Sequence, residues 1–471
     1  MTARHVVVVG GGFAGLAAAV RLARAGTHTT LLERRPFLGG RAYSFAHPVT
    51  GEVVDNGPHA LMGAYTEALD FLGEIGASAK LRVQPRLRVT LAHPELGLGE
   101  IAAPAVPGPL QAPLALLRYR LLTRGDRARL FAGALRLAAR GSALAGRTVA
   151  EALADVGQSR AACERFWHPL AIATLNEAPE IAAAAPFAAV LRRAFFAGAR
   201  AARFALAAVP LSELYTSDAR RAIGAAGGTV ATGAAVASLA LEGERVGGVL
   251  LRDGRRVDAD AVVLAVPCAA LLRLLPPALR DEPPFRALAA IGTSPIVSVH
   301  LWLDRPVGWG SSFLGLLGGR AQWLFDCGPA RDGGQRVASV TSGARFWDDA
   351  SDEAIAAEVL ADARAVLPVL RDARCTRSLV VRERHATISL TPAADAVRPA
   401  VTTPLANLFL AGDWVQTGLP ATIEGAVQAG REAARRALAA PVAHARAEAA
   451  RLSRSRAPTP SGRPGGRCAS T

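Results

Sequence analysis

Three glycines near the start of the chain, Gly10, Gly12 and Gly15, have the spacing of a loop that binds a dinucleotide pyrophosphate. They follow the β-branched run 5–9 and precede the apolar segment 16–25, so we expect a strand, a tight turn and a helix. Gly10 permits the turn, Gly12 lets backbone amides approach the phosphates, and Gly15 lets helix and strand pack closely. The N-terminus of that helix would present unpaired N–H groups to the anion.

A carboxylate and a second glycine turn follow this unit. Glu33 ends the next predicted strand, where it can accept hydrogen bonds from a ribose diol and would repel a 2′-phosphate. This residue does not distinguish NAD from FAD. Gly39 and Gly40 would let a loop fold over the pyrophosphate, and Arg41 would neutralise it. The same two turns contain three further predicted cofactor contacts: Phe13, Ala14 and Arg34.

Two features near the other end of the chain favour FAD over NAD. Gly412 and Asp413 follow a predicted buried strand, and a carboxylate beside a glycine turn can bind the ribityl hydroxyls that NAD lacks. A predicted helix over 420–439 begins near Thr422 and Ile423, so its N-terminal amides could face the pyrimidine carbonyls of a flavin. Together with the N-terminal turns, these features predict non-covalently bound FAD.

The predicted cofactor contacts come from both ends of the chain, so separate segments must assemble the domain that carries them. We expect an α/β fold with a Rossmann-type FAD-binding domain, built on a non-contiguous parallel sheet, and a second α+β substrate domain. In chain order, we predict FAD-binding pieces at 1–80, 211–285 and 401–442, a mainly helical lobe facing substrate or membrane at 81–210, the sheet and helices of the substrate domain at 286–400, and a basic disordered tail at 443–471.

The composition is globular, with an excess of arginine. The chain has 471 residues, of which 51% are hydrophobic, and a formal net charge of +15, which can reflect genomic base composition as easily as binding. Between residues 117 and 147, eight arginines and one acidic residue are interleaved with leucines. This pattern is typical of a basic amphipathic helix on an anionic membrane, and equally of an ordinary solvated helix face.

Several classes of protein are disfavoured. Five cysteines without a CxxC pair argue against a disulfide framework or a zinc site, so we expect no metal and a reduced, cytoplasmic compartment. We see neither a signal peptide nor a run of about 18 apolar residues, so any membrane contact should be peripheral, on the inner face of the plasma membrane. The arginines lack interleaved stacking residues, so we do not expect nucleic acid as a partner.

Beyond these patterns, the chain resembles the amine oxidase and phytoene desaturase superfamily of FAD enzymes. Within it, the chain is most similar to the hydroxysqualene dehydroxylases, also called squalene-associated FAD-dependent desaturases. The resemblance covers nearly everything to about residue 440. The segments that carry it are 55–63, 167–170, 301–306, 318–326, 408–414 and 417–426, of which the last two are the most specific.

The resemblance implies removal of the hydroxyl of hydroxysqualene to give squalene, on the route to hopanoids. Squalene-pathway enzymes are then the functional neighbours. Val236 matches a position whose backbone meets the adenine in the family. The flavin-contacting positions of the family correspond to Gly10, Gly12, Gly15, Glu33, Gly40, Arg41, Gly412 and Asp413. The sequence departs from the family pattern at Pro58, which we include among the cofactor contacts, and at 176–179.

Replacing an allylic C–OH by C–H requires a hydride, which reduced flavin supplies, and help for a poor leaving group. His59 is the first candidate for a catalytic and flavin-contacting group, because its segment approaches the isoalloxazine in related enzymes. Glu424, at the start of the last helix, is the second, and Asp55 should shape the loop or touch the cofactor. His168, Glu177 and His385 are weaker candidates, and Phe195, Phe196, Phe204 and Leu206 could line an apolar channel or form ordinary core.

Three alternatives remain open from the sequence. Desaturation of a carotenoid-like polyene would share the fold and the channel but run the flavin in the oxidative direction. Amine oxidation is less favoured, because many such enzymes use a lysine near flavin N5, whereas the single lysine, Lys80, lies at a predicted helix end. A non-catalytic scaffold that binds flavin or membrane is the third alternative.

Overall fold

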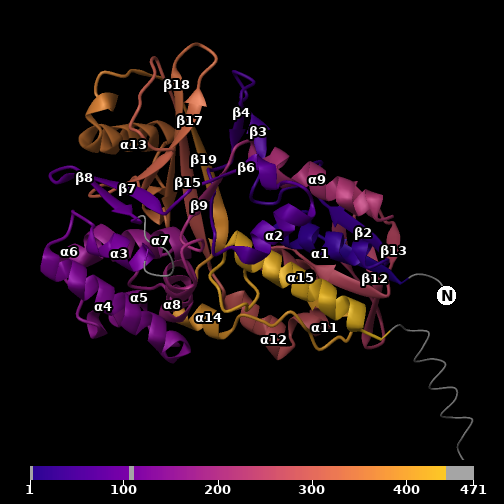
Figure 1. The fold of residues 1–471 in the computed structure, drawn as a ribbon. Coiled ribbons are helices and arrows are strands. Elements are labelled where there is room, and N and C mark those ends of the chain that lie inside the picture. Colours follow the sequence, from indigo (N-terminus) through magenta and orange to yellow (C-terminus); the bar gives the residue numbers. More distant parts are fainter. Residues whose placement is uncertain (1–3, 105–110, 442–471) are drawn as a thin grey trace, which may run out of the picture.

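The β-branched run at the start of the chain forms β1 (His5–Val9), the central strand of a parallel sheet. The computed structural model describes residues 4–104 and 111–441 (Figure 1). Val6, Val7 and Val8 are completely buried, as expected for a strand covered on both faces. The sheet has the order β10 (Thr229–Thr232), β2 (His28–Glu33), β1, β14 (Ala261–Leu264) and β20 (Leu408–Leu410), which confirms a parallel sheet built from distant segments.

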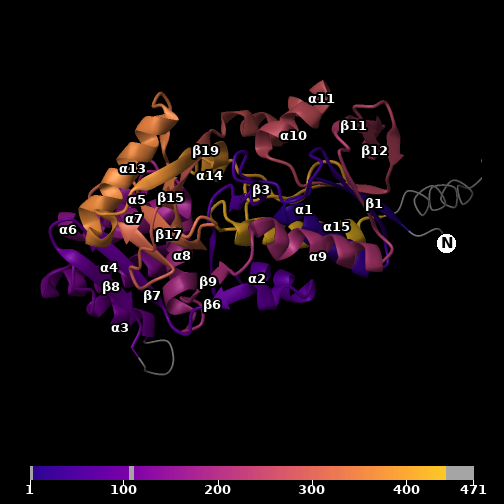
Figure 2. The same cartoon turned by 90° about the horizontal axis from the view of Figure 1, so that it is seen from above.

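Three helices from distant parts of the chain pack together beside this sheet. α1 (Phe13–Arg24) contacts both α9 (Leu211–Ala225) and α15 (Ile423–Ala439). Figure 2 shows the three lying together at one end of the molecule. A side chain at Gly430 would overlap the backbone of Ala14, so α1 and α15 can approach this closely only because a glycine stands there. A small antiparallel sheet, formed by β11 (Val236–Glu242), β12 (Arg245–Leu251) and β13 (Arg256–Asp258), contacts β14.

The second domain is built on a seven-stranded sheet covered on one side by α13 (Asp352–Val366) (Figure 1). All neighbouring strands of this sheet are antiparallel except β16 and β7. In sheet order the strands are β19 (Cys375–Ile388), β15 (Thr293–Leu303), β18 (Gln335–Ser342), β17 (Trp323–Pro329), β16 (Phe313–Leu316), β7 (Arg88–His93) and β8 (Gly97–Ala102). β7 and β8 belong to the range predicted as mainly helical, but their hydrogen bonds complete this sheet. The domain boundaries themselves stay a prediction.

A group of helices lies below the seven-stranded sheet in Figure 1. Its members are α3 (Gln111–Leu117), α4 (Arg124–Arg140), α5 (Val149–Asp155), α6 (Arg160–Ala162), α7 (His168–Leu175) and α8 (Ala184–Leu191), with two π-helical turns, η4 (Cys163–Trp167) and η5 (Arg192–Phe196). The basic run 117–147 is therefore not one helix. Thr123 caps α4 by accepting a hydrogen bond from the Asp126 amide, and Gly141, with φ of 50°, ends it.

Short elements connect the two domains. β5 (Ala60–Met62) and β6 (Leu81–Val83) pair with β9 (Phe204–Ala207), and α2 (Thr66–Glu74) follows β5. The remaining elements are β3 (Ser44–Ala46), β4 (Val53–Asp55), α10 (Cys268–Leu274), α11 (Pro277–Arg280), α12 (Pro283–Arg286) and α14 (Pro392–Ala396). Within the described residues, no helix has the length and apolar character needed to cross a membrane. The predicted tail 443–471 lies outside the described residues.

Candidate active site

The first glycine turn has the geometry of a phosphate cradle. Gly10 has φ of 109°, and a Cβ on it would overlap the carbonyl oxygen of Ala265. A Cβ on Gly15 would overlap the carbonyl oxygen of Gly10, so helix and strand touch here as predicted. Gly12 is the N-cap of α1 and has no side chain to accept from the first-turn N–H groups, which are therefore left for another acceptor. The turn therefore fits an anionic phosphate group.

Glu33 is buried at the end of β2, and its carboxylate is fixed toward the glycine turn. One oxygen accepts a hydrogen bond from the Gly11 amide at 2.7 Å, and the other accepts one from the Arg35 amide at 2.9 Å. Each carboxylate oxygen can accept a second hydrogen bond. Glu33 is thus held by the backbone and still able to receive the hydroxyls of a ribose.

The second glycine turn lies directly against the first. Gly39 and Gly40 have φ of 125° and 59°, and a Cβ on Gly40 would lie 3.0 Å from the Cα of Gly12. The exposed Arg34 makes no hydrogen bond or ion pair with another described residue, whereas Arg35 donates to the Gly40 carbonyl oxygen at 2.9 Å. The sequence did not single out Arg35, because adjacent arginines at a strand end are indistinguishable without coordinates.

A tyrosine that the sequence did not indicate supports both turns. Tyr215, on α9, has one hydroxyl proton to share between the carbonyl oxygens of Gly39 and Ala42, which lie 2.7 Å and 3.0 Å from its oxygen. Its ring stacks on Phe13 with centroids 3.8 Å apart, while Ala14 packs against α15. Phe13 and Ala14 therefore stand in the first turn of α1, in the predicted place.

Arg41 and Asp413 meet although 372 residues separate them. A guanidinium nitrogen of Arg41 lies 2.6 Å from a carboxylate oxygen of Asp413, and another donates to the carbonyl oxygen of Ala386. Burial lowers the pKa of Arg41, but the Asp413 carboxylate outweighs that effect and the pKa is raised overall. Gly412 has φ of 143°, and a Cβ on it would lie 2.6 Å from the Trp414 indole nitrogen. The two predicted charged contacts thus belong to one site.

A buried arginine that the sequence did not indicate holds the segment between β20 and α15. The Arg398 side chain is fully buried and pairs with Asp395 at 3.2 Å. Its guanidinium also donates to four backbone carbonyl oxygens of the segment: Asp413 (3.1 Å), Trp414 (3.2 Å), Val415 (2.7 Å) and Leu419 (2.7 Å). Arg398 therefore helps to fix the backbone from Asp413 to Leu419, which leads to the start of α15.

The start of α15 follows the prediction, but the carboxylate of Glu424 has a structural partner. Thr422 caps the helix by accepting from the Gly425 amide at 3.3 Å. Glu424 is 2% exposed and accepts from the backbone amides of Glu67 at 3.1 Å and Ala68 at 2.9 Å, so it caps α2. Burial raises the pKa of Glu424. Its catalytic role stays a prediction.

His59 immediately precedes β5, next to Pro58. Its Nδ1 lies 2.7 Å from the Gly57 carbonyl oxygen, which only accepts, so this nitrogen carries the proton in the neutral ring. Burial lowers the pKa of His59, which favours that neutral form. The remaining nitrogen, Nε2, is then an acceptor and can donate only after the ring is protonated.

Other candidates from the sequence have structural partners. Asp55 accepts from the Ser44 hydroxyl at 2.6 Å and from the Leu211 amide at 3.0 Å, which ties its loop to α9. Two charged side chains form ion pairs: Glu177 with Arg345, and Lys80 with Asp218. Two histidines lie elsewhere. His385 contacts the Thr293 hydroxyl, and His168 lines a separate surface pocket with His93 and Arg165. Lys80 is therefore held in a structural ion pair.

The predicted channel residues divide into two groups. Phe195 is buried against Phe166, with ring centroids 6.5 Å apart, and forms ordinary core. Phe204 and Leu206 lie in β9, where Leu206 pairs with Ala60, the residue after His59. The half-buried Phe196 packs against the same core.

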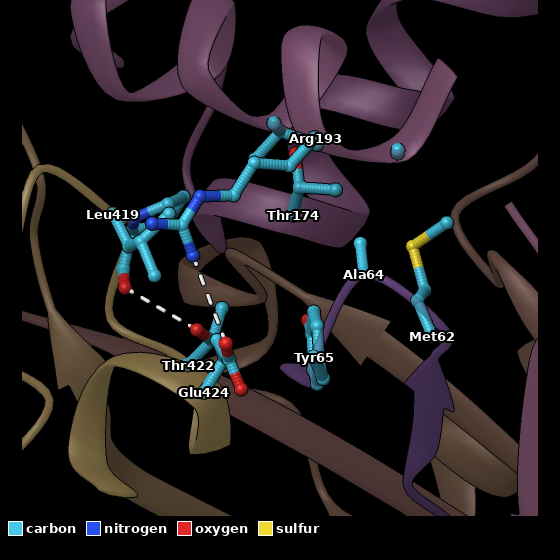
Figure 3. A pocket seen from close by; sticks show the side chains of 11 residues that line it. Met62, Ala64, Tyr65, Thr174, Arg193, Leu419, Thr422 and Glu424 are labelled. Atoms are coloured by element: carbon cyan, nitrogen blue, oxygen red, sulfur yellow. Dashed lines mark hydrogen bonds and ion pairs between the residues drawn. The ribbon is translucent and has the colours of Figure 1, made fainter. Parts of the chain in front are cut away.

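A cavity opens between α15, the segment after β5 and the helical lobe (Figure 3). Its apolar lining comprises Met62, Ala64, Val190, Ala194, Leu419 and Pro420, and its polar lining comprises Tyr65, Thr174, Arg193, Thr422 and Glu424. Tyr65, Thr174 and Arg193 were not among the predicted site residues, since no motif marks them. Within residues 4–104 and 111–441, no cluster of three histidine, cysteine or acidic side chains could hold a metal ion.

The chain matches the family model described as flavin containing amine oxidoreductase over residues 13–438. A solved structure of a putrescine oxidase triple mutant shares the fold, with a TM-score of 0.71 and 19% identity over 93% of this chain and 99% of that chain. Fold and site therefore define a flavin-containing oxidoreductase of two α/β domains.

Two relatives narrow this class. The chain is 34% identical to the hydroxysqualene dehydroxylase of Rhodopseudomonas palustris over 93% of this chain and 99% of that protein. It is 26% identical to the 15-cis-phytoene desaturase of Synechococcus elongatus over 91% of this chain and 94% of that protein. The chain belongs to the hydroxysqualene dehydroxylase family, within the flavin containing amine oxidoreductases.

Proposed function

We propose that this enzyme reduces hydroxysqualene to squalene, replacing an allylic C–OH by C–H. The observation that carries the proposal is the full-length similarity to a relative named for that reaction. The lining of the small cavity beside α15 supports it, because apolar side chains with one polar end suit the oxygen-bearing carbon of an allylic alcohol.

We propose FAD as the flavin. The first-turn amides of α1 after Gly12 would hold its pyrophosphate, Glu33 its ribose, and Arg41 with Asp413 the phosphate and ribityl groups. Val236, half-buried at the start of β11, would meet the adenine. Bound there in its reduced form, FAD supplies the hydride.

The remaining tasks fall to side chains of this chain. Apolar residues of the cavity exclude water from the reacting carbon. His59 stays our first candidate for a polar group at the flavin, as an acceptor at Nε2 when neutral and a proton donor when charged. The Glu424 carboxylate, already bonded to two amides of α2, would act by holding charge in place.

Carotenoid-type desaturation is the second candidate, favoured by the similarity to a phytoene desaturase. The two reactions differ in the direction of hydride transfer, so one experiment separates them. The chemically reduced enzyme is incubated anaerobically with hydroxysqualene, and the oxidised enzyme with phytoene. We expect flavin reoxidation together with squalene formation in the first arm. Failure of that arm would refute the dehydroxylase proposal, and flavin reduction by phytoene would support the alternative.

We further propose a cytoplasmic enzyme in peripheral contact with the inner face of the plasma membrane. Leu117 and Leu135, on α3 and α4, have exposed fractions of 39% and 44%, and the neighbouring side chains of Arg118, Arg120 and Arg136 are exposed. This combination suits an anionic lipid surface. Sedimentation with anionic vesicles, but not with zwitterionic ones, is the expected result, and a failure to bind either kind would contradict it.

A further inference from the structure

One cation at the polar end of the cavity has no direct hydrogen bond. Arg193 stands in η5, and its nearest guanidinium nitrogen lies 3.6 Å from a Glu424 oxygen, beyond hydrogen-bonding distance. Within residues 4–104 and 111–441, no other partner of this guanidinium is found. A guanidinium carries five N–H donors, and 42% of this side chain is exposed. Donors of Arg193 are therefore available to a molecule in the cavity.

The Glu424 carboxylate explains why the guanidinium stays at this end. Its oxygens are fixed by the amides of Glu67 and Ala68, and the Thr66 hydroxyl donates at 3.4 Å. A buried carboxylate attracts a counter-charge strongly, and Arg193 is the cation that reaches it (Figure 3). The pair therefore holds the guanidinium across the cavity from Tyr65.

Other residues around the cavity add a second donor and apolar surface. Burial raises the pKa of Tyr65 to about 12, so its phenol stays protonated and keeps a proton to donate. Met62, Val190 and Ala194 supply apolar lining. The lining therefore offers polar donors to one oxygen atom, next to an apolar wall.

We propose that Arg193 binds the hydroxyl oxygen of a long-chain allylic alcohol at this polar end, and that Glu424 positions the guanidinium. The proposal rests on the proposed function. In the reaction, the carbon–oxygen bond would break with its electron pair on oxygen, and the carbon would accept a hydride that the reduced flavin, when bound, would supply. The oxygen would accept one proton, for which the protonated His59 ring is the candidate donor, and leave as water. Arg193 stabilises the charge that develops on oxygen but does not supply the proton, because a guanidinium stays protonated in proteins.

Binding of alcohol and hydrocarbon should separate this role from a structural one. Hydroxysqualene and squalene are titrated into the oxidised, flavin-loaded enzyme, which cannot turn the alcohol over. We expect Arg193→Met to weaken hydroxysqualene binding about 10- to 100-fold and to leave squalene binding unchanged, because only the alcohol receives the charged hydrogen bond. Arg193→Lys should restore part of the affinity, and Glu424→Gln should show a smaller loss confined to the alcohol.

Arg192→Met is the matched control. Arg192 is the preceding residue of η5, but its exposed guanidinium lies over Gly141, outside the cavity lining. It should leave both affinities unchanged. Equal weakening of both ligands by Arg193→Met, or no weakening, would overturn the proposal. A failure of the proposed function would give another result: the reduced wild-type enzyme would form no squalene from hydroxysqualene, whatever the binding affinities of the variants.

Discussion

Arg398→Met should loosen the segment that joins β20 to α15 and weaken flavin binding. The Arg398 side chain is fully buried and holds four backbone carbonyls between Asp413 and Leu419. Methionine fills similar space but donates nothing. Each carbonyl left without its donor costs about 1 kcal/mol, so the loss of folding free energy should be about 4 kcal/mol. Removing one partner of a buried ion pair, here with Asp395, costs a comparable 3–5 kcal/mol, as an order of magnitude.

Two measurements test this prediction. Urea unfolding followed by flavin release should show a lower midpoint, and the purified variant should contain less flavin than the wild type, because Asp413 moves with its loop. Arg364→Met is the control, since Arg364 also donates to two backbone carbonyls, those of Leu370 at 3.2 Å and Ala373 at 2.7 Å, but in the second domain. The Arg364→Met variant should lose folding stability but keep its flavin. An Arg398→Met enzyme with normal flavin content and an unchanged midpoint would refute the reasoning.

Three further predictions concern the cofactor turn, the candidate catalytic histidine and a buried ion pair. Gly10→Ala should abolish flavin binding, seen as loss of the visible absorbance. Gly224→Ala, where a Cβ meets only open space, should retain the flavin. Flavin retained by both variants would contradict the proposal that the Gly10 turn holds the phosphate. His59→Ala should keep the flavin and lose most turnover, and unchanged turnover would remove His59 from the mechanism. Burial raises the pKa of Glu177, but hydrogen bonds from Arg345 and Ser389 outweigh it and lower the pKa overall. The substitution Glu177→Gln should therefore lower the free energy of unfolding by about 1–3 kcal/mol at pH 7. That difference should shrink as the pH falls through the lowered pKa of the folded state, and a cost independent of pH would contradict the linkage.

Much of the first domain was predictable because its signals are local. A short valine run, three glycines at fixed spacing and Glu33 at the next strand end lie within the first 33 residues, and together they predict strand, turn and helix. The placement of Gly412 and Asp413 after a buried strand was predictable for the same reason. Each depends on neighbours in the chain, and the structure puts each in the expected element.

The partners of individual side chains were not predictable. In an arginine-rich sequence, nothing distinguishes Arg193 and Arg398 from other arginines. In the structure, Arg193 lies near Glu424, and Arg398 donates hydrogen bonds to the segment after β20. The strands β7 and β8 likewise gave no sign that they would complete a sheet whose other strands begin two hundred residues later.

The sequence by itself determined the two glycine turns, the carboxylate at the end of β2 and the start of α15, because backbone conformation follows from residue types within a few positions. The tertiary structure alone decided that Arg41 faces Asp413, that Glu424 caps α2, and that the cavity has a polar end. The physical reason is that a side chain bonds to whatever its element packs against. Packing joins segments whose distance along the chain carries no information about their distance in space.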